Sequence, residues 1–225
     1  MGTFIRYRLH GKRHLSRLIY GARTSIYLIV VIIIIRYTIA ILIGVLAGYF
    51  RGAADEILMR VTDIFLAFPS IILAMAIAAA MGPGLNTVII AISVTGLGWA
   101  ARLIRSQVLS VREQPYIEAA KALGAGNLRI ILFHILPNCM GPLIVQATVS
   151  VGWIVLIAAA LSFIGAGAPP PTLEWGLMVA EGRAYFMSAP WVSLFPGIAI
   201  FITVVGANLL GDGLRDVMDP RLRRR

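Results

Sequence analysis

Long apolar runs alternate with short polar segments along most of this chain of 225 residues. The hydrocarbon core of a bilayer is about 30 Å thick, and about 20 helical residues at 1.5 Å each are needed to cross it. We expect five membrane spans, at residues 25–50, 64–81, 86–104, 142–164 and 191–210. Because only helices and closed barrels satisfy their backbone in lipid, and these runs have helical length, the pattern predicts an all-α, polytopic membrane helix bundle.

The composition agrees with a membrane protein. Hydrophobic residues make up 59% of the chain and charged residues 13%, whereas a soluble domain has about 25% charged residues. The net charge is +10, but the basic residues flank the apolar spans. This placement points to membrane topology and lipid headgroups rather than to nucleic acid.

The charges also predict an orientation. If the loop between the third and fourth spans lies in the cytoplasm, most basic residues lie on the cytoplasmic side, and the two opposite links hold only Arg183. That asymmetry follows the positive-inside rule. Five spans would then place the basic segment 1–24 outside, against the same rule.

Residue types that carry chemistry are sparse. The single Cys139 excludes an intramolecular disulfide, and three scattered histidines have no metal-ligand spacing. We therefore expect no metal site and no cofactor. No G-x-x-x-x-G-K-[ST] phosphate-binding sequence occurs, so the chain is not expected to hydrolyse ATP itself.

The loop at residues 115–138 reads PYIEAAKALGAGNLRIILFHILPN and has the most balanced polar and apolar pattern of the chain. Pro115 suits a first helical position, and strong helix formers follow it. Gly124 is expected to end that helix. Asn127 is the expected N-cap of a second short helix, which Pro137 is expected to end. Two short helices of this kind suit docking into a groove on another protein.

Part of this loop resembles the "EAA" loop of ABC importer permeases. The resemblance is carried by Glu118-Ala119-Ala120, Gly124 and Leu136-Pro137. In that family the loop forms a coupling helix that inserts into a cytoplasmic ATPase subunit. The resemblance therefore implies that these six residues couple the chain to an ATPase. The family usually has a hydrophobic residue where this chain has His134.

Further motifs lie in the same order along the chain as in the "C" permease subunits of dipeptide, oligopeptide and nickel importers. They are Ala47-Gly48-Tyr49-Phe50, Leu66-Ala67-Phe68-Pro69, Leu161-Ser162-Phe163-Ile164-Gly165, Glu174-Trp175-Gly176 and the tail from Asn208 to Arg223. The resemblance covers most of the chain.

The resemblance implies the type I ABC importer transmembrane fold. The family usually has six spans, so the chain reads as lacking the first one. We expect a basic lead at 1–24, the transmembrane domain at 25–211 and a basic cytoplasmic tail at 212–225. The implied location is the bacterial inner membrane. The implied partners are a second related permease, two cytoplasmic ATPases and an extracytoplasmic solute-binding protein.

Three functional alternatives are open from the sequence. The resemblance implies import of di- or oligopeptides, and the same class of transporter could instead carry nickel or another small solute. A secondary transporter would need intramembrane carboxylates or broken helices, and none of the five spans contains Asp or Glu. A membrane scaffold without transport activity is the third alternative.

Two features have two readings each. Arg36 lies near the middle of the first span, where an arginine costs roughly 2.5–3.5 kcal/mol on insertion scales. It is either a residue of the transport pathway or an arginine that faces the bundle interior or snorkels. The link at 165–190 either carries function or forms a partly buried cap over helix ends.

Overall fold

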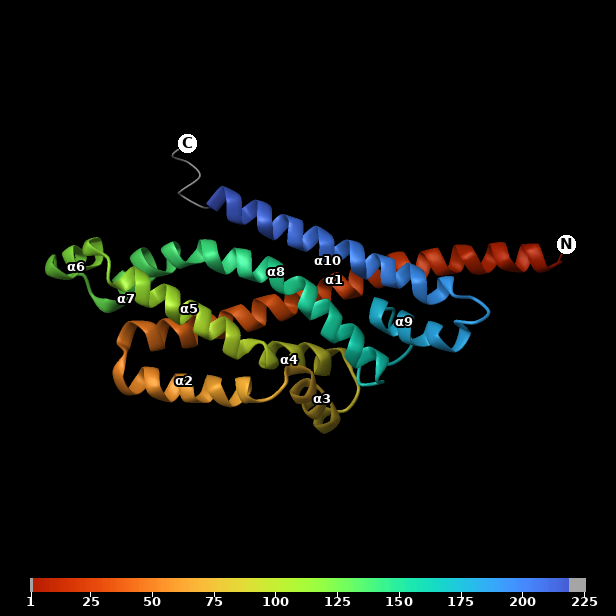
Figure 1. The fold of residues 1–225 in the computed structure, drawn as a ribbon, viewed down its shortest axis with the longest axis horizontal. Coiled ribbons are helices and arrows are strands. Elements are labelled where there is room, and N and C mark those ends of the chain that lie inside the picture. The colour runs from red at the N-terminus through yellow and green to blue at the C-terminus, as the bar shows by residue number, and fades with distance from the viewer. Residues whose placement is uncertain (1, 219–225) are drawn as a thin grey trace. The chain divides into compact units, whose positions relative to one another are not determined.

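The computed structural model describes residues 2–218, with side chains described for residues 14–217. Within that part of the chain every regular element is a helix, which confirms the all-α class (Figure 1). The α-helices are α1 Gly2–Phe50, α2 Gly52–Ala67, α3 Ser70–Met81, α4 Leu85–Thr95, α5 Leu97–Arg112, α6 Pro115–Ala122, α7 Asn127–Ile130, α8 Leu136–Phe163, α9 Trp175–Gly182 and α10 Trp191–Met218. A π-helical turn, Ile131–Ile135, joins α7 to α8, and a 3₁₀ turn, Arg183–Tyr185, follows α9.

Three helical stretches of the described chain are long and apolar enough to cross a membrane, and the number rises to five if each of two bent helix pairs is one span. The three stretches are His14–Phe50, Asn127–Phe163 and Trp191–Val217. Helix α1 is continuous through residues 24 and 25, so no helix end marks the expected boundary of the basic lead. Residue 1, the side chains of 2–13 and the last part of the tail, 219–225, lie outside the described residues.

The second expected span, 64–81, is not one helix. Helices α2 and α3 meet at an angle of 91°, and the break falls at Pro69. Proline lacks an N–H and excludes the α conformation at the residue before it. Phe68, which precedes Pro69, accordingly has an extended backbone with φ −98° and ψ 139°. Whether the bent pair crosses the membrane as one span stays a prediction.

The third expected span, 86–104, is also interrupted. Helices α4 and α5 are bent by 41° around Gly96, a break that the sequence analysis did not anticipate. Arg36 of α1 is buried, with 4% of its surface exposed, and its guanidinium lies directly against Gly96. Gly96 follows the C-terminal end of α4, where a cation is favoured by the helix dipole. Of the two readings of Arg36, the structure supports the one in which it faces the protein interior.

The described chain forms two compact units. The first contains the chain up to Ile32, Ala74–Ile92 and Val151–Gly206, and the second contains Ile33–Leu73, Ser93–Ser150 and the chain from Ala207. The second unit holds a core of buried side chains from α1, α5, α6, α7, the π-helical turn and α8, which includes Ala40, Ile104, Val108, Ile117, Ile130, Ile135 and Cys139. The loop at 115–138 therefore belongs to the second unit and packs on its core.

Two glycines allow α1 and α5 to approach each other closely in the second unit. A Cβ at Gly44 would lie 2.7 Å from the backbone oxygen of Ala101, and a Cβ at Gly48 would lie 2.9 Å from Cβ of Val108. Gly44 and Gly48 form a G-x-x-x-G spacing, which brings helix backbones together in membrane proteins. This contact fixes α5, and with it the start of the 115–138 loop, against the end of α1.

The contact between Arg36 and Gly96 predicts a specific stability effect. Gly96 has φ −91° and ψ −4°, which alanine can adopt, so Gly96→Ala acts only by pushing its Cβ into the buried guanidinium. We expect it to lower the free energy of unfolding by about 1–3 kcal/mol, the usual cost of overpacking. The measurement is unfolding of the detergent-purified protein.

In an Arg36→Leu background the same substitution should cost less, because the shorter side chain leaves this space open. Gly206→Ala in α10 is the matched control, since a Cβ there meets no atom within 4 Å. Equal costs of Gly96→Ala in the two backgrounds would contradict the contact, because a double-mutant cycle isolates the interaction of the two residues.

Candidate functional site

Helix α6 has the start that the sequence predicted. Pro115 occupies the first turn, and Gln114 before it has an extended backbone with φ −77° and ψ 142°. Ile117 is fully buried in the core of the second unit, while Glu118 is exposed in the first turn, where the positive end of the helix dipole favours an acidic side chain. Helix α6 is thus anchored to the core by the apolar side chain of Ile117, and its polar face is exposed.

Gly124 ends α6 in a Schellman motif. Its N–H donates to the carbonyl of Lys121 over 2.9 Å, and the N–H of Ala125 donates to the carbonyl of Ala120 over 3.0 Å. This motif needs a left-handed residue after the helix cap, and Gly124 has φ +81°. A Cβ at Gly124 would meet no atom within 4 Å. The glycine is therefore required for its backbone conformation and not for space.

The second half of the loop differs from the prediction in two ways. Gly126, with φ −69° and ψ 158°, is the N-cap, and Asn127 is the first helical residue. The Asn127 side chain makes no cap bond, and its Oδ1 accepts a hydrogen bond of 2.8 Å from the Tyr49 hydroxyl instead. The prediction that Asn127 caps this helix is therefore wrong.

The prediction that Pro137 ends the second helix is also wrong. The helical path runs from α7 through the π-helical turn into α8, and Pro137 lies in the first turn of α8. Proline removes one backbone donor from a helix, and a π-turn is one way for a helix to absorb such a disruption. Beside it, the side-chain Nδ2 of Asn138 donates to the carbonyl of His134 over 2.6 Å.

The six residues implied by the resemblance fall into two groups. Glu118, Ala119 and Gly124 are exposed and Ala120 is half-buried, all on α6 and its C-terminal turn. Leu136 is half-buried and Pro137 exposed, and both belong to the start of α8. The first group forms one outward-facing segment, and the second group leads the chain back into the long helix.

Exposed apolar side chains on this loop were missed by the sequence analysis. Leu123 is 88% exposed, Leu128 70% and Phe133 71%. Large apolar side chains that gather on an exposed surface mark contacts with another protein or with the membrane. The sequence gives little indication that these side chains are exposed, because apolar residues of a short amphipathic helix normally face the core. We call Glu118, Leu123, Leu128 and Phe133 the loop face.

Ion pairs connect α2 to α5. The Arg105 guanidinium donates two hydrogen bonds to the Asp55 carboxylate, of 2.5 and 2.6 Å. Arg102 pairs with Asp63 over 2.5 Å. Exposed pairs contribute little, but the two-bond geometry of the Asp55 pair is the stronger kind.

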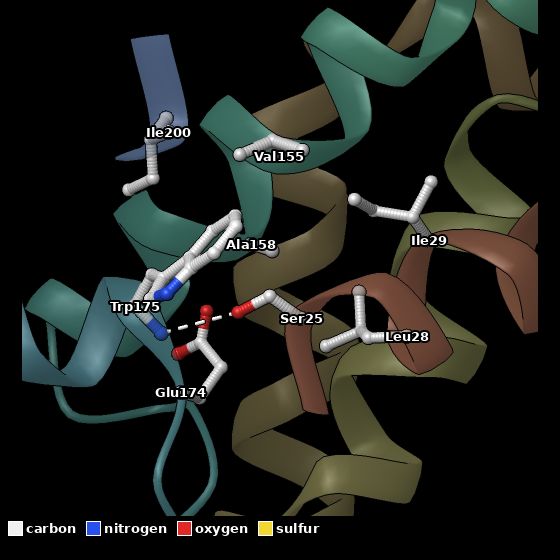
Figure 2. A pocket seen from close by; sticks show the side chains of 8 residues that line it. All are labelled: Ser25, Leu28, Ile29, Val155, Ala158, Glu174, Trp175 and Ile200. Carbon is white, nitrogen blue, oxygen red and sulfur yellow. Dashed lines mark hydrogen bonds between the residues drawn. The ribbon is translucent and has the colours of Figure 1, made fainter. Parts of the chain in front are cut away.

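The first unit contains a buried polar cluster, of which Figure 2 shows Ser25, Glu174 and Trp175. Glu174 caps α9 by accepting hydrogen bonds of 2.9 Å from the N–H groups of Gly176 and Leu177. Ser162 Oγ donates to the same carboxylate over 2.9 Å. The backbone N–H of Trp175 donates to Ser25 Oγ over 3.2 Å, the dashed line in Figure 2. This cluster fastens the start of α9 to α1 and α8.

The cavity beside this cluster is too small for a substrate. Its volume is about 10 Å³, room for about one water molecule, whereas small-molecule sites have about 300–1,000 Å³. The link at 165–190 is helical over α9 and buried at Glu174 and Trp175, which fits the reading as a partly buried cap. Among the described residues, no group of three His, Cys, Asp or Glu side chains could hold a metal ion.

Two relatives of known assignment align with almost the whole chain. The dipeptide transport system permease protein of Alkalihalophilus pseudofirmus is 46% identical over 213 residues, which cover 95% of this chain and 70% of the relative. The di/tripeptide transport system permease protein of Pseudomonas aeruginosa is also 46% identical, over 213 residues with the same coverage.

A solved structure shares the fold. The inward-facing MetNI methionine ABC transporter matches with a TM-score of 0.73 and 23% identity, over 91% of this chain and 97% of that chain. The fold is therefore that of an ABC importer transmembrane subunit. Residues 40–224 match the family described as "Binding-protein-dependent transport system inner membrane component", and the chain belongs to that family of integral membrane permeases.

Proposed function

We propose that this chain is the permease subunit of an ATP-driven importer that translocates di- and oligopeptides across the cytoplasmic membrane. The observation that carries the proposal is the 46% identity to a dipeptide permease over 95% of the chain. An alignment of that extent includes the loop at 115–138 as well as the apolar helices.

In this proposal ATP hydrolysis takes place in a separate subunit, because the sequence has no phosphate-binding motif. The complete importer would contain a second related permease, two cytoplasmic ATPases and an extracytoplasmic binding protein. The loop face would dock in a groove of the ATPase. The apolar side chains of Leu123 and Leu128 would be its anchors, and Glu118 would contribute a negative charge to the contact. Closure of the ATPases would then move α6 and switch the permease between outward and inward access.

The helix breaks bear on the rival reading as a secondary transporter. Broken helices are one of the two features expected of such transporters, and the chain has breaks at Phe68–Pro69 and at Gly96. Breaks of this kind therefore do not separate the two classes. The family membership favours the ATP-driven class.

The substrate is tested by uptake in a strain that lacks this gene. We expect loss of the subunit to abolish uptake of labelled dipeptides and a plasmid copy to restore it, while ⁶³Ni²⁺ uptake stays unchanged. Loss of nickel uptake with normal dipeptide uptake would instead assign the chain to the small-solute alternative.

The role of Gly124 is tested by two substitutions that differ in backbone preference. Gly124→Val should weaken capture of the ATPase and lower peptide uptake several-fold, because a β-branched residue at φ +81° carries a penalty of about 1–2 kcal/mol. Gly124→Asn should stay close to wild type, since Asn adopts left-handed conformations more readily. Co-purification of the ATPase and uptake are measured on the same cells. Full uptake by Gly124→Val with the ATPase still bound would show that the turn geometry is dispensable.

The charge of the loop face is tested at Glu118. Glu118→Lys should leave the subunit in the membrane but reduce ATPase capture, because the exposed carboxylate changes sign at the proposed docking surface. Glu56→Lys is the matched charge reversal, on an exposed position of α2. Similar losses of ATPase capture in both variants would point to a general effect of charge and not to docking at α6.

A further inference from the structure

Tyr49 connects the end of α1 to the far side of the loop. The side chain is in the last turn of α1 and only 4% exposed. Its hydroxyl donates a hydrogen bond of 2.8 Å to Oδ1 of Asn127, the first residue of α7. In the sequence Tyr49 is part of the motif Ala47-Gly48-Tyr49-Phe50, which by itself indicates no role for it.

The ring of Tyr49 also contacts two cations. Cζ of Arg112 lies 5.8 Å from the ring centroid, and Nζ of Lys121 lies 5.9 Å from it. Cations within about 6 Å of an aromatic face are attracted by the ring, and more strongly when they are removed from water. Nη1 of Arg112 is buried and makes no hydrogen bond within the described structure. The Tyr49 ring is one of the groups that this guanidinium contacts.

These three contacts come from three different elements. Arg112 is the last residue of α5, Lys121 lies in α6, and Asn127 opens α7. One buried side chain of α1 therefore contacts the end of α5, helix α6 and the start of α7. Next to it, Arg51 pairs with Glu113, the residue after α5, over 2.5 Å, which adds a second link at the loop entry.

We propose that Tyr49 is a positioning residue that holds the loop to α1, so that a displacement of α6 is passed to this membrane helix. The inference rests on the proposed function, in which the ATPase moves α6. Ile117 anchors α6 in a core that also contains side chains of α1, but it is a single apolar contact near the start of α6. The contacts of Tyr49 add a fixed position of the loop relative to the last turn of α1. Without them, a displacement of α6 would be passed to α1 less completely.

The test uses the complete importer in proteoliposomes and compares Tyr49→Phe with Tyr49→Leu. The phenylalanine variant loses only the hydrogen bond to Asn127, and the leucine variant also loses the cation contacts. We expect the ATPase to remain bound and ATP to be hydrolysed in both. The number of peptides transported per ATP should fall by about two- to tenfold in Tyr49→Phe, the range of one hydrogen bond, and further in Tyr49→Leu. Tyr27→Leu, at an exposed position of the same helix, should leave the ratio unchanged.

A second measurement does not depend on transport. Hydrogen exchange of the amides in 115–130 should become faster in Tyr49→Leu, whereas exchange in the middle of α8 should not change. The double variant Tyr49→Phe/Asn127→Ala should accelerate this exchange no more than either change alone, because both substitutions remove the same hydrogen bond.

The outcomes separate the inference from the proposed function. A wild-type complex that binds no ATPase or transports no peptide contradicts the proposed function, and the exchange measurement then still decides whether Tyr49 holds the loop. Unchanged exchange overturns the inference. An unchanged ratio of peptide to ATP, with uptake and hydrolysis reduced in parallel, also overturns it, because that pattern belongs to a purely structural residue.

Discussion

The close approach of α1 and α5 at Gly44 and Gly48 sets the geometry of the second unit. In lipid, helix association depends on packing rather than on exclusion of water, so backbone contact at small residues is an effective way to hold two helices. The position of α5 in turn decides where α6 begins, because only Glu113 and Gln114 lie between them. The ion pair between Asp55 and Arg105 adds α2 to the same arrangement.

The loop combines rigid turns with an open face. A Schellman motif at Gly124 and a π-helical turn at Ile131–Ile135 fix how the chain leaves α6 and enters α8. Near these turns, the side chains of Leu123 and Leu128 are exposed. A segment whose backbone is determined and whose apolar side chains are unpartnered loses little conformational entropy on binding, which is what a docking element requires.

Buried polar groups occur in both units, and each has a local reason. Arg36 occupies space that the missing side chain of Gly96 leaves at the end of α4. The carboxylate of Glu174 accepts hydrogen bonds from two backbone N–H groups and from Ser162. Buried polar groups are stable when they are bonded in this way, so the buried carboxylate of Glu174 is explained without a ligand.

The sequence by itself determined the fold class, the start of α6 at Pro115 and the turn at Gly124, because hydrophobic run length and the backbone preferences of proline and glycine are local properties. It also carried the family motifs. Only the tertiary structure decided the break at Gly96, the continuation of the helix past Pro137 and the bond between Tyr49 and Asn127. Each of these depends on a neighbour distant in sequence or on a helix path that a single residue type does not specify. The contact at Gly96 involves Arg36, which is 60 residues away in the sequence. Asn127 accepts a hydrogen bond from Tyr49 instead of capping its own helix, because the fold places the end of α1 next to the start of α7.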